Sequence, residues 1–189
     1  MLLIDNPSYT VKMLGFKKLV KVVAFGSSGS GKTTLVRRIG SSGRKAGYHG
    51  NGCSATVAFD LSVIDGEHSK VYLYSTPGSE RFQFVAKIVA TGLNIGLLIV
   101  DSSRKMTDYE KTLLKELKSK GIPFIIVANK ADLPGFSLEN IRNDIGPNCL
   151  VLPVSATAGY GTDTLVNTIM DIANRLAPKG LSTSALVKA

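Results

Sequence analysis

The sequence predicts an α/β fold: a mostly parallel sheet of six strands, with helices on both faces and one antiparallel edge strand. Three observations support this fold class. Apolar runs typical of buried strands alternate along the chain with segments of helical periodicity. The pair Asp65-Gly66 separates two strand-like runs and indicates a hairpin. A loop rich in glycine and serine follows the first apolar run and precedes the first helical segment.

The first half of the chain contains the hairpin and the first helix. The apolar run 19–25 predicts the first strand, and the segment 32–39 predicts the helix that follows it. Residues 40–55 are rich in glycine and serine, so we expect a loop there. The runs 56–64 and 70–74 flank the hairpin turn and predict an antiparallel pair at the edge of the sheet.

The second half continues the alternation of helices and strands. Buried strands are expected over 95–100, 122–128 and 150–154, where short apolar runs occur. Helices are expected over 84–90, 106–118 and 137–145, and a last helix is expected to face inward through Leu165, Val166, Ile169, Ile172 and Leu176.

A chain of 189 residues is long enough for one domain with a substantial core. We expect this domain over residues 18–177, an N-terminal extension over 1–17, and a flexible C-terminal tail over 178–189 after the proline that ends the last helix. No secretory signal and no apolar run of about 18 residues is apparent, so we expect at most peripheral contact with a membrane.

The cysteines and the net charge bear on the compartment of the protein and on its partners. Cys53 and Cys149 lie far apart without metal-ligand spacing and read as free thiols, which favours the cytoplasm. The net charge of +9 is compatible with nucleic acid or anionic lipid as a partner, and equally with a solvated basic surface. The basic residues are spread out, so nucleic acid is not expected as a partner.

The loop between the first strand and the first helix carries the pattern Gly26-Ser-Ser-Gly-Ser-Gly-Lys-Thr33, which is typical of a phosphate-binding loop. Its glycines let backbone N–H groups surround phosphate oxygens, and the positive end of the helix dipole adds to the site. We therefore expect a P-loop NTPase fold, with Lys32 on the β- and γ-phosphates and the Thr33 hydroxyl on Mg²⁺. The residues expected to contact the phosphates are Gly29, Ser30, Gly31, Lys32, Thr33 and Thr34.

Two further motifs follow later strands and predict a guanine site. The Asp132 carboxylate can accept hydrogen bonds from the ring N–H and the amino group of guanine, a donor pair that adenine lacks. Asn129 is expected to tie the base loop to the phosphate loop, and the Lys130 stem to lie on the ring face. In the second motif, Ser155-Ala156-Thr157, the backbone N–H of Ala156 is expected to donate to the guanine carbonyl oxygen.

With these motifs, residues 18–177 resemble the Ras-like small GTPases. The resemblance implies that Thr56, with Ser54 as the alternative, contacts Mg²⁺ and the γ-phosphate, and that the Gly78 N–H senses the γ-phosphate. Metal contacts are thus expected from Thr33 and Thr56, and catalytic roles from Lys32, Thr56 and Gly78. The Thr76-Pro77-Gly78 stretch resembles the MglA-type GTPases of prokaryotic cell polarity, which implies a GTPase-activating partner such as a roadblock-type dimer.

Two positions depart from the small GTPase pattern. Ser75 stands where most relatives have an aspartate that orients the magnesium shell, and Ser79 stands where they have a water-positioning glutamine. Ser75 cannot supply a negative charge near Mg²⁺, which predicts weaker metal binding. Both changes predict slow hydrolysis, because phosphoryl transfer depends on positioning and electrostatics. Glu80, Arg44 and Arg81 are candidates to replace the lost groups, although each has an ordinary surface role as its alternative.

These expectations converge on a GTP-binding molecular switch that binds GTP or GDP with Mg²⁺, hydrolyses GTP slowly, and controls effector binding through two loops, 40–56 and 76–84. The alternative is a nucleotide-binding interaction or receptor subunit with little GTPase activity, which the serines at 75 and 79 favour. A GTPase that acts on ribosomes or RNA is suggested by the charge alone.

Overall fold

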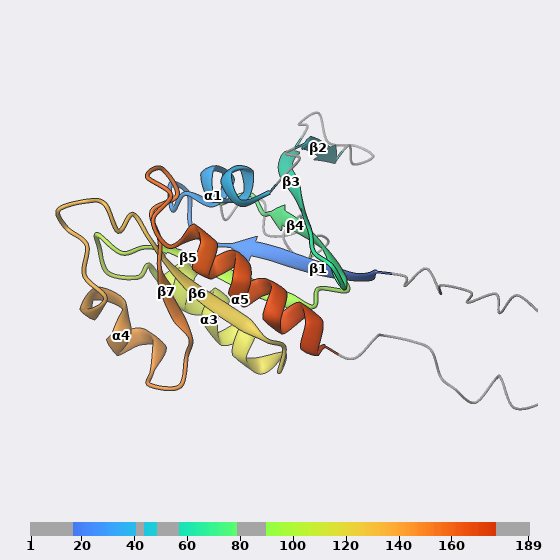
Figure 1. Cartoon of the computed structure of the whole chain (residues 1–189). Coiled ribbons are helices and arrows are strands. Elements are labelled where there is room, and N and C mark those ends of the chain that lie inside the picture. Colours follow the sequence, from blue (N-terminus) through green and yellow to red (C-terminus); the bar gives the residue numbers. More distant parts are fainter. Residues whose placement is uncertain (1–16, 41–43, 49–56, 79–89, 177–189) are drawn as a thin grey trace, which may run out of the picture.

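The computed structural model describes residues 17–40, 44–48, 57–78 and 90–176 of the chain (Figure 1). Within these ranges the chain forms a seven-stranded sheet in the order β2-β3-β4-β1-β5-β6-β7. The strands are β1 (Lys18–Phe25), β2 (Arg44–Tyr48), β3 (Val57–Asp65), β4 (Ser69–Ser75), β5 (Ile95–Asp101), β6 (Phe124–Asn129) and β7 (Val151–Pro153). The helices are α1 (Lys32–Ile39), α3 (Asp108–Ser119), α4 (Glu139–Ile145) and α5 (Thr162–Arg175).

The predicted α/β sheet is confirmed with its six expected strands, and β2 adds a seventh strand at the edge outside β3. Strands β4, β1, β5, β6 and β7 run parallel, and β3 pairs antiparallel with β4 across the predicted hairpin. The Gly66 N–H donates to the carbonyl oxygen of Ser69 at 3.0 Å and closes the turn. The helix expected over 84–90 falls outside the described residues, apart from residue 90.

Strand β2 was not predicted, because we expected an uninterrupted loop over 40–55. It pairs antiparallel with the start of β3, from Tyr48 opposite Val57 to Arg44 opposite Leu61. The sequence Arg-Lys-Ala-Gly-Tyr has no strand-like alternation of apolar and polar residues. The open hydrogen-bonding edge of β3 supplies the pairing groups, so a neighbouring strand and not local sequence accounts for β2.

The two faces of the sheet are covered by different helices. Val22 and Ala24 of β1 belong to the core cluster that includes residues of α1 and α5. Val23 and Phe25, which alternate with them, belong to the cluster that includes residues of α3 and α4. This alternation follows from the two-residue period of a strand. In the described part of the chain, no helix is long and apolar enough to cross a membrane.

The parallel strands bring several polar segments to one edge of the sheet. Asp101 ends β5 and lies opposite Asn129, which ends β6, while the phosphate loop follows β1 on the same edge. Thr76, directly after β4, donates both its N–H and its hydroxyl to the carbonyl oxygen of Ala24, at 2.9 and 3.0 Å. Ligands of open α/β sheets bind beyond this carboxyl edge.

Candidate nucleotide-binding site

The phosphate loop turns directly from β1 into α1. Gly31 precedes the helix with φ of 92°, a left-handed conformation that L side chains rarely adopt. A Cβ atom at this position would also collide with Nδ2 of Asn129. Glycine is therefore required at position 31, where the loop and the base motif lie in contact.

Lys32 is buried at the start of α1, with a relative exposure of 6%. Its Nζ donates to the carbonyl oxygen of Ser27 at 2.6 Å and lies 3.5 Å from Oγ of Ser30. Burial lowers the pKa of Lys32 to about 8, while the negative charge of Glu110 opposes the shift. The ammonium group is thus charged at neutral pH and held within the loop that is expected to receive phosphates.

A cavity of about 350 Å³ lies between the phosphate loop and strands β3 and β4. The loop and α1 contribute Ser28, Gly29, Gly31, Lys32, Thr33 and Thr34, and the opposite side contributes Asp60, Ser75, Thr76, Pro77 and Gly78. Most of the predicted phosphate-contacting residues therefore share one cavity. Ser30 is fully buried and does not line the cavity, and Thr56 lies outside the described residues.

Gly78 lies against the phosphate loop. A Cβ atom there would be 2.6 Å from Nζ of Lys32 and 2.7 Å from the backbone nitrogen of Ser28. Any larger residue would push into the cavity, so the close approach requires glycine. Ser79, Glu80 and Arg81 fall outside the described residues, and for Arg44 the structure describes only the strand β2 in which it lies.

Asn129 joins the phosphate loop to both base motifs. Its Nδ2 donates to the carbonyl oxygen of Ser30 at 2.8 Å, which confirms the predicted link between the two loops. Its Oδ1 accepts from the N–H of Ala156 at 3.0 Å, so the donor that we expected to face guanine already has a partner. The side chain is 2% exposed, and both ends of the amide are satisfied.

Lys130 and Asp101 form an ion pair next to this link. Lys130 Nζ lies 2.5 Å from Oδ2 of Asp101, and the Lys130 backbone has φ of 67°. Burial raises the pKa of Asp101, but hydrogen bonds from Lys130 and Ser103 outweigh burial and hold the pKa below its usual range. The sequence interpretation missed Asp101, whose place at the end of β5 was the available signal.

The base-selecting residues lie together although they come from two loops. The hydroxyl of Thr157 donates to Oδ2 of Asp132 at 3.3 Å, and the buried Ser155 accepts from the N–H of Ala158 at 3.0 Å. A hydrogen bond from Ser155 lowers the pKa of Asp132, so this exposed carboxylate is ionised at neutral pH. An ionised acceptor is what recognition of the guanine donor pair requires.

Glu110 of α3 contacts the phosphate loop and was missed in the sequence. It is fully buried, and its Oε1 accepts from the hydroxyl of Ser27 at 2.5 Å and from Nη2 of Arg104 at 3.1 Å. Burial raises the pKa of Glu110, but these bonds outweigh burial and lower the pKa overall. Glu110 also closes a capping box with Thr107, and the Thr-x-x-Glu spacing was the signal that could have revealed it.

Asp60 of β3 is the third residue, after Asp101 and Glu110, that the sequence interpretation did not single out. Its backbone N–H donates to the hydroxyl of Ser75 at 3.2 Å, and that hydroxyl donates to Oδ2 of Asp60 at 3.3 Å. Arg37 of α1 holds the other oxygen, Oδ1, through Nε at 2.9 Å and Nη2 at 2.6 Å. Asp60 thereby brings a carboxylate to the cavity beside Ser75.

The cavity suits a magnesium ion bound together with phosphates. No group of three or more His, Cys, Asp or Glu within the described ranges could hold a metal ion alone. Magnesium is usually held by one or two protein oxygens together with substrate phosphates and water. The Thr33 hydroxyl and the Asp60 carboxylate, both on the cavity wall, fit that donor set.

The sequence of the chain matches a known protein family. Residues 17–175 match the elongation factor Tu GTP-binding domain. The chain belongs to this family. It is therefore a GTP-binding domain of the P-loop GTPase type. Translation factors and FeoB are among its neighbours, and the resemblance to Ras-like and MglA-type GTPases stays a prediction.

Relatives by sequence include a short archaeal protein and translation factors. An uncharacterized protein of Methanocaldococcus jannaschii is 34% identical over 154 residues, which cover 82% of this chain and 97% of that protein. Translation initiation factor IF-2 of Finegoldia magna is 26% identical over 183 residues. That match covers 89% of this chain but 24% of the initiation factor.

Solved structures show the same fold. Translation elongation factor SelB of Methanococcus maripaludis, in complex with the GTP analogue GPPNHP, has a TM-score of 0.65 at 22% identity. That likeness covers 87% of this chain and 35% of SelB. The G domain of the T. maritima FeoB iron transporter has a TM-score of 0.63 at 19% identity, with 82% of this chain and 99% of that domain covered.

Proposed function

We propose that this GTP-binding domain is a molecular switch that binds GTP or GDP with Mg²⁺ and hydrolyses GTP slowly. The observation that carries the proposal is the bond from Asn129 to Ser30, which unites the phosphate loop and the guanine motifs in one site. Family membership supports GTP as the nucleotide. An effector would distinguish the GTP-bound form from the GDP-bound form by the conformation of loops 40–56 and 76–84.

The proposed roles of the residues follow from their chemistry. Lys32 would leave the carbonyl of Ser27 to bind the β- and γ-phosphates, and the Gly78 N–H would bind the γ-phosphate across the cavity. The Thr33 hydroxyl would hold Mg²⁺, and Thr56 would join it from a segment that the structure does not describe. When bound, Mg²⁺ would neutralise charge on the phosphates.

Slow hydrolysis is proposed from the serines at positions 75 and 79. Ser75 lacks the negative charge of aspartate, and Ser79 has a shorter side chain than the glutamine that positions water. Single-turnover hydrolysis of GTP by the purified protein with Mg²⁺ tests this. We expect a half-life of hours. A half-life of minutes would contradict slow chemistry and would assign a catalytic role to Arg44, Arg81 or Glu80, which single substitutions would identify.

An interaction or receptor subunit with little GTPase activity is the alternative, and the same two serines favour it. A GTPase-activating partner distinguishes the two functions, because it would accelerate hydrolysis by a switch. A roadblock-type dimer as that partner rests only on the MglA-type resemblance of Thr76-Pro77-Gly78. If such a dimer does not bind the GTP form of the protein, the proposal of a roadblock-type partner is wrong.

A role in translation is a third candidate, favoured by the names of the relatives and the net charge of +9. The chain spans only part of those factors, so their activities are not transferred whole. Sedimentation with ribosomes in GTP but not GDP, weakened by salt, would support this role. The two widely spaced cysteines lead us to propose the cytoplasm as its location.

A further inference from the structure

The phosphate cavity contains a carboxylate at an unexpected position. Among the described residues that line the cavity, Asp60 is the one acidic side chain. Position 75, where most small GTPases carry the aspartate of the magnesium site, is occupied by serine. A neutral hydroxyl cannot supply the charge that a magnesium shell usually faces.

The strand register explains how Asp60 can stand in for an aspartate at position 75. Leu61 pairs with Tyr74 in the antiparallel β3–β4 ladder, so Asp60 and Ser75 are the next neighbours across the two strands. Residues directly opposite each other in such a pair share one face of the sheet. A carboxylate on residue 60 therefore faces the same side as one on residue 75.

The two carboxylate oxygens of Asp60 have different partners. Arg37 binds Oδ1 through two nitrogens, while Oδ2 contacts the Ser75 hydroxyl. The Asp60 side chain is 12% exposed and the Arg37 side chain 49% exposed. The arginine fork fixes the orientation of the carboxylate, as supporting contacts do for metal ligands.

We propose that Asp60 supplies the carboxylate of the magnesium site, with Ser75 as the hydroxyl that positions it. The carboxylate has thus moved from the end of β4 to the facing residue of β3. This inference rests on the proposed function, because it concerns the ion that accompanies the bound nucleotide.

Release of fluorescently labelled GDP, measured while Mg²⁺ is titrated against EDTA, tests the assignment without relying on hydrolysis. The Mg²⁺ midpoint is the Mg²⁺ concentration at which half of the protein retains its GDP. We expect this midpoint to rise by about 10- to 100-fold in Asp60→Asn. With excess EDTA, the variant and the original chain should release GDP at the same rate, because contacts to the nucleotide itself are unchanged. An unchanged Mg²⁺ midpoint in Asp60→Asn would overturn the proposal.

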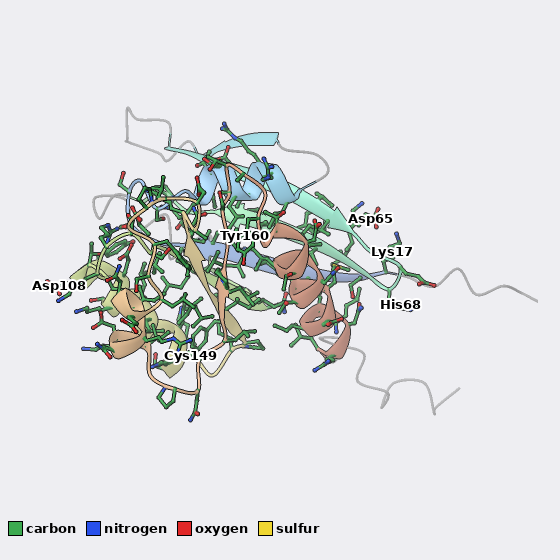
Figure 2. All side chains as sticks on the ribbon, turned by 60° about the vertical axis from the view of Figure 1, so that its left-hand side comes forward. Lys17, Asp65, His68, Asp108, Cys149 and Tyr160 are labelled. Atoms are coloured by element: carbon green, nitrogen blue, oxygen red, sulfur yellow. The ribbon has the colours of Figure 1, made fainter. Side chains whose placement is uncertain are left out.

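Two control variants separate metal binding from support of the fold. Asp65→Asn makes the same change on the same strand, at the exposed ion pair with Lys17 (Figure 2), and should leave the midpoint unchanged. Arg37→Gln breaks the ion pair to Asp60 but keeps the carboxylate, so we expect its midpoint to shift by less than that of Asp60→Asn. If Arg37→Gln shifts the midpoint as far as Asp60→Asn does, Asp60 acts by anchoring α1 and the proposal is wrong.

An exchange variant covers the case in which Asp60→Asn does not fold. The double substitution Asp60→Ser with Ser75→Asp returns the carboxylate to position 75 and should restore the original Mg²⁺ midpoint. Failure of a folded exchange variant to retain GDP with Mg²⁺ would count against the proposal. If the original chain holds no GDP, the proposed function itself fails. If it holds GDP and Asp60→Asn behaves like it, only the role of Asp60 fails.

Discussion

Asn129 donates a 2.8 Å hydrogen bond to the carbonyl oxygen of Ser30 across 99 positions of sequence. The same side chain accepts from Ala156, so one buried amide fixes the phosphate loop relative to both base motifs. A nucleotide that spans the two halves of the site binds more tightly when their relative position is already fixed, because binding then does not pay the cost of ordering the loops.

Replacing Asn129 by alanine should lower the free energy of unfolding in the absence of nucleotide. The substitution leaves the Ala156 N–H and the Ser30 carbonyl without their partner, at a cost of about 2 kcal/mol. Urea unfolding measures this change. Asn143→Ala, on the exposed face of α4, should stay within about 0.5 kcal/mol. Equal effects of the two substitutions would contradict the linking role of Asn129.

Nucleotide affinity should depend on pH through Lys32, whose pKa is about 8 in the free protein. Below pH 8 the lysine already carries its proton, so affinity for GDP should be constant. Above pH 8, binding must take up a proton, because phosphates favour the ammonium form. Affinity should then fall as pH rises, by up to about tenfold per unit. Calorimetric titration from pH 7 to 9 measures the fall.

Glu110→Gln provides the control for this pH dependence. The negative charge of Glu110 raises the pKa of Lys32, so its removal should move the start of the fall to lower pH. Ionisation of the nucleotide itself is the same for both proteins and cancels in the comparison. Constant affinity up to pH 9, or identical curves for the two proteins, would contradict the assigned state of Lys32.

The buried contacts of Glu110 predict a large loss of stability in Glu110→Ala. Removal of the carboxylate takes a partner from Arg104, Ser27 and the capping box of α3, with an expected loss of about 3 kcal/mol. Lys111→Ala, one residue along, breaks a partly exposed ion pair with Asp144 and should lose less than about 1 kcal/mol. Chemical denaturation of both variants would detect the difference, and comparable losses would refute it.

Asp132→Asn should change the base that the protein selects. The amide side chain cannot accept both guanine donors, whereas xanthine replaces the amino group with an oxygen that an amide N–H can reach. We expect the affinity for XTP to exceed that for GTP in competition binding. Asp163→Asn, an exposed residue at the start of α5, should keep the preference for GTP. Unchanged guanine selectivity in Asp132→Asn would show that the base site is assigned wrongly.

Local patterns account for what the sequence could predict. The phosphate loop and the Asp65-Gly66 turn have short, fixed spacings whose conformation depends on neighbouring residues, and both occur where we expected them. The meeting of Asn129 with the phosphate loop followed from the rule that parallel strands end at one edge.

Tertiary contacts account for what the sequence could not predict. Strand β2 depends on the open edge of β3, and its own composition favours a loop. The contact between Asp60 and Ser75 depends on the register of two strands, which a hairpin motif alone does not set. Glu110 differs from both, because its capping-box spacing was visible but its contact with Ser27 was not.

Competition of GTP, GDP and ATP for the protein loaded with fluorescent GDP and Mg²⁺ tests the central claim most directly. The Asp132 carboxylate can accept two hydrogen bonds that guanine donates and adenine does not, so we expect GTP and GDP to compete on the order of a thousandfold better than ATP. Comparable competition by ATP, or no retention of the fluorescent nucleotide, would contradict a guanine-specific site formed by the phosphate loop and the base motifs.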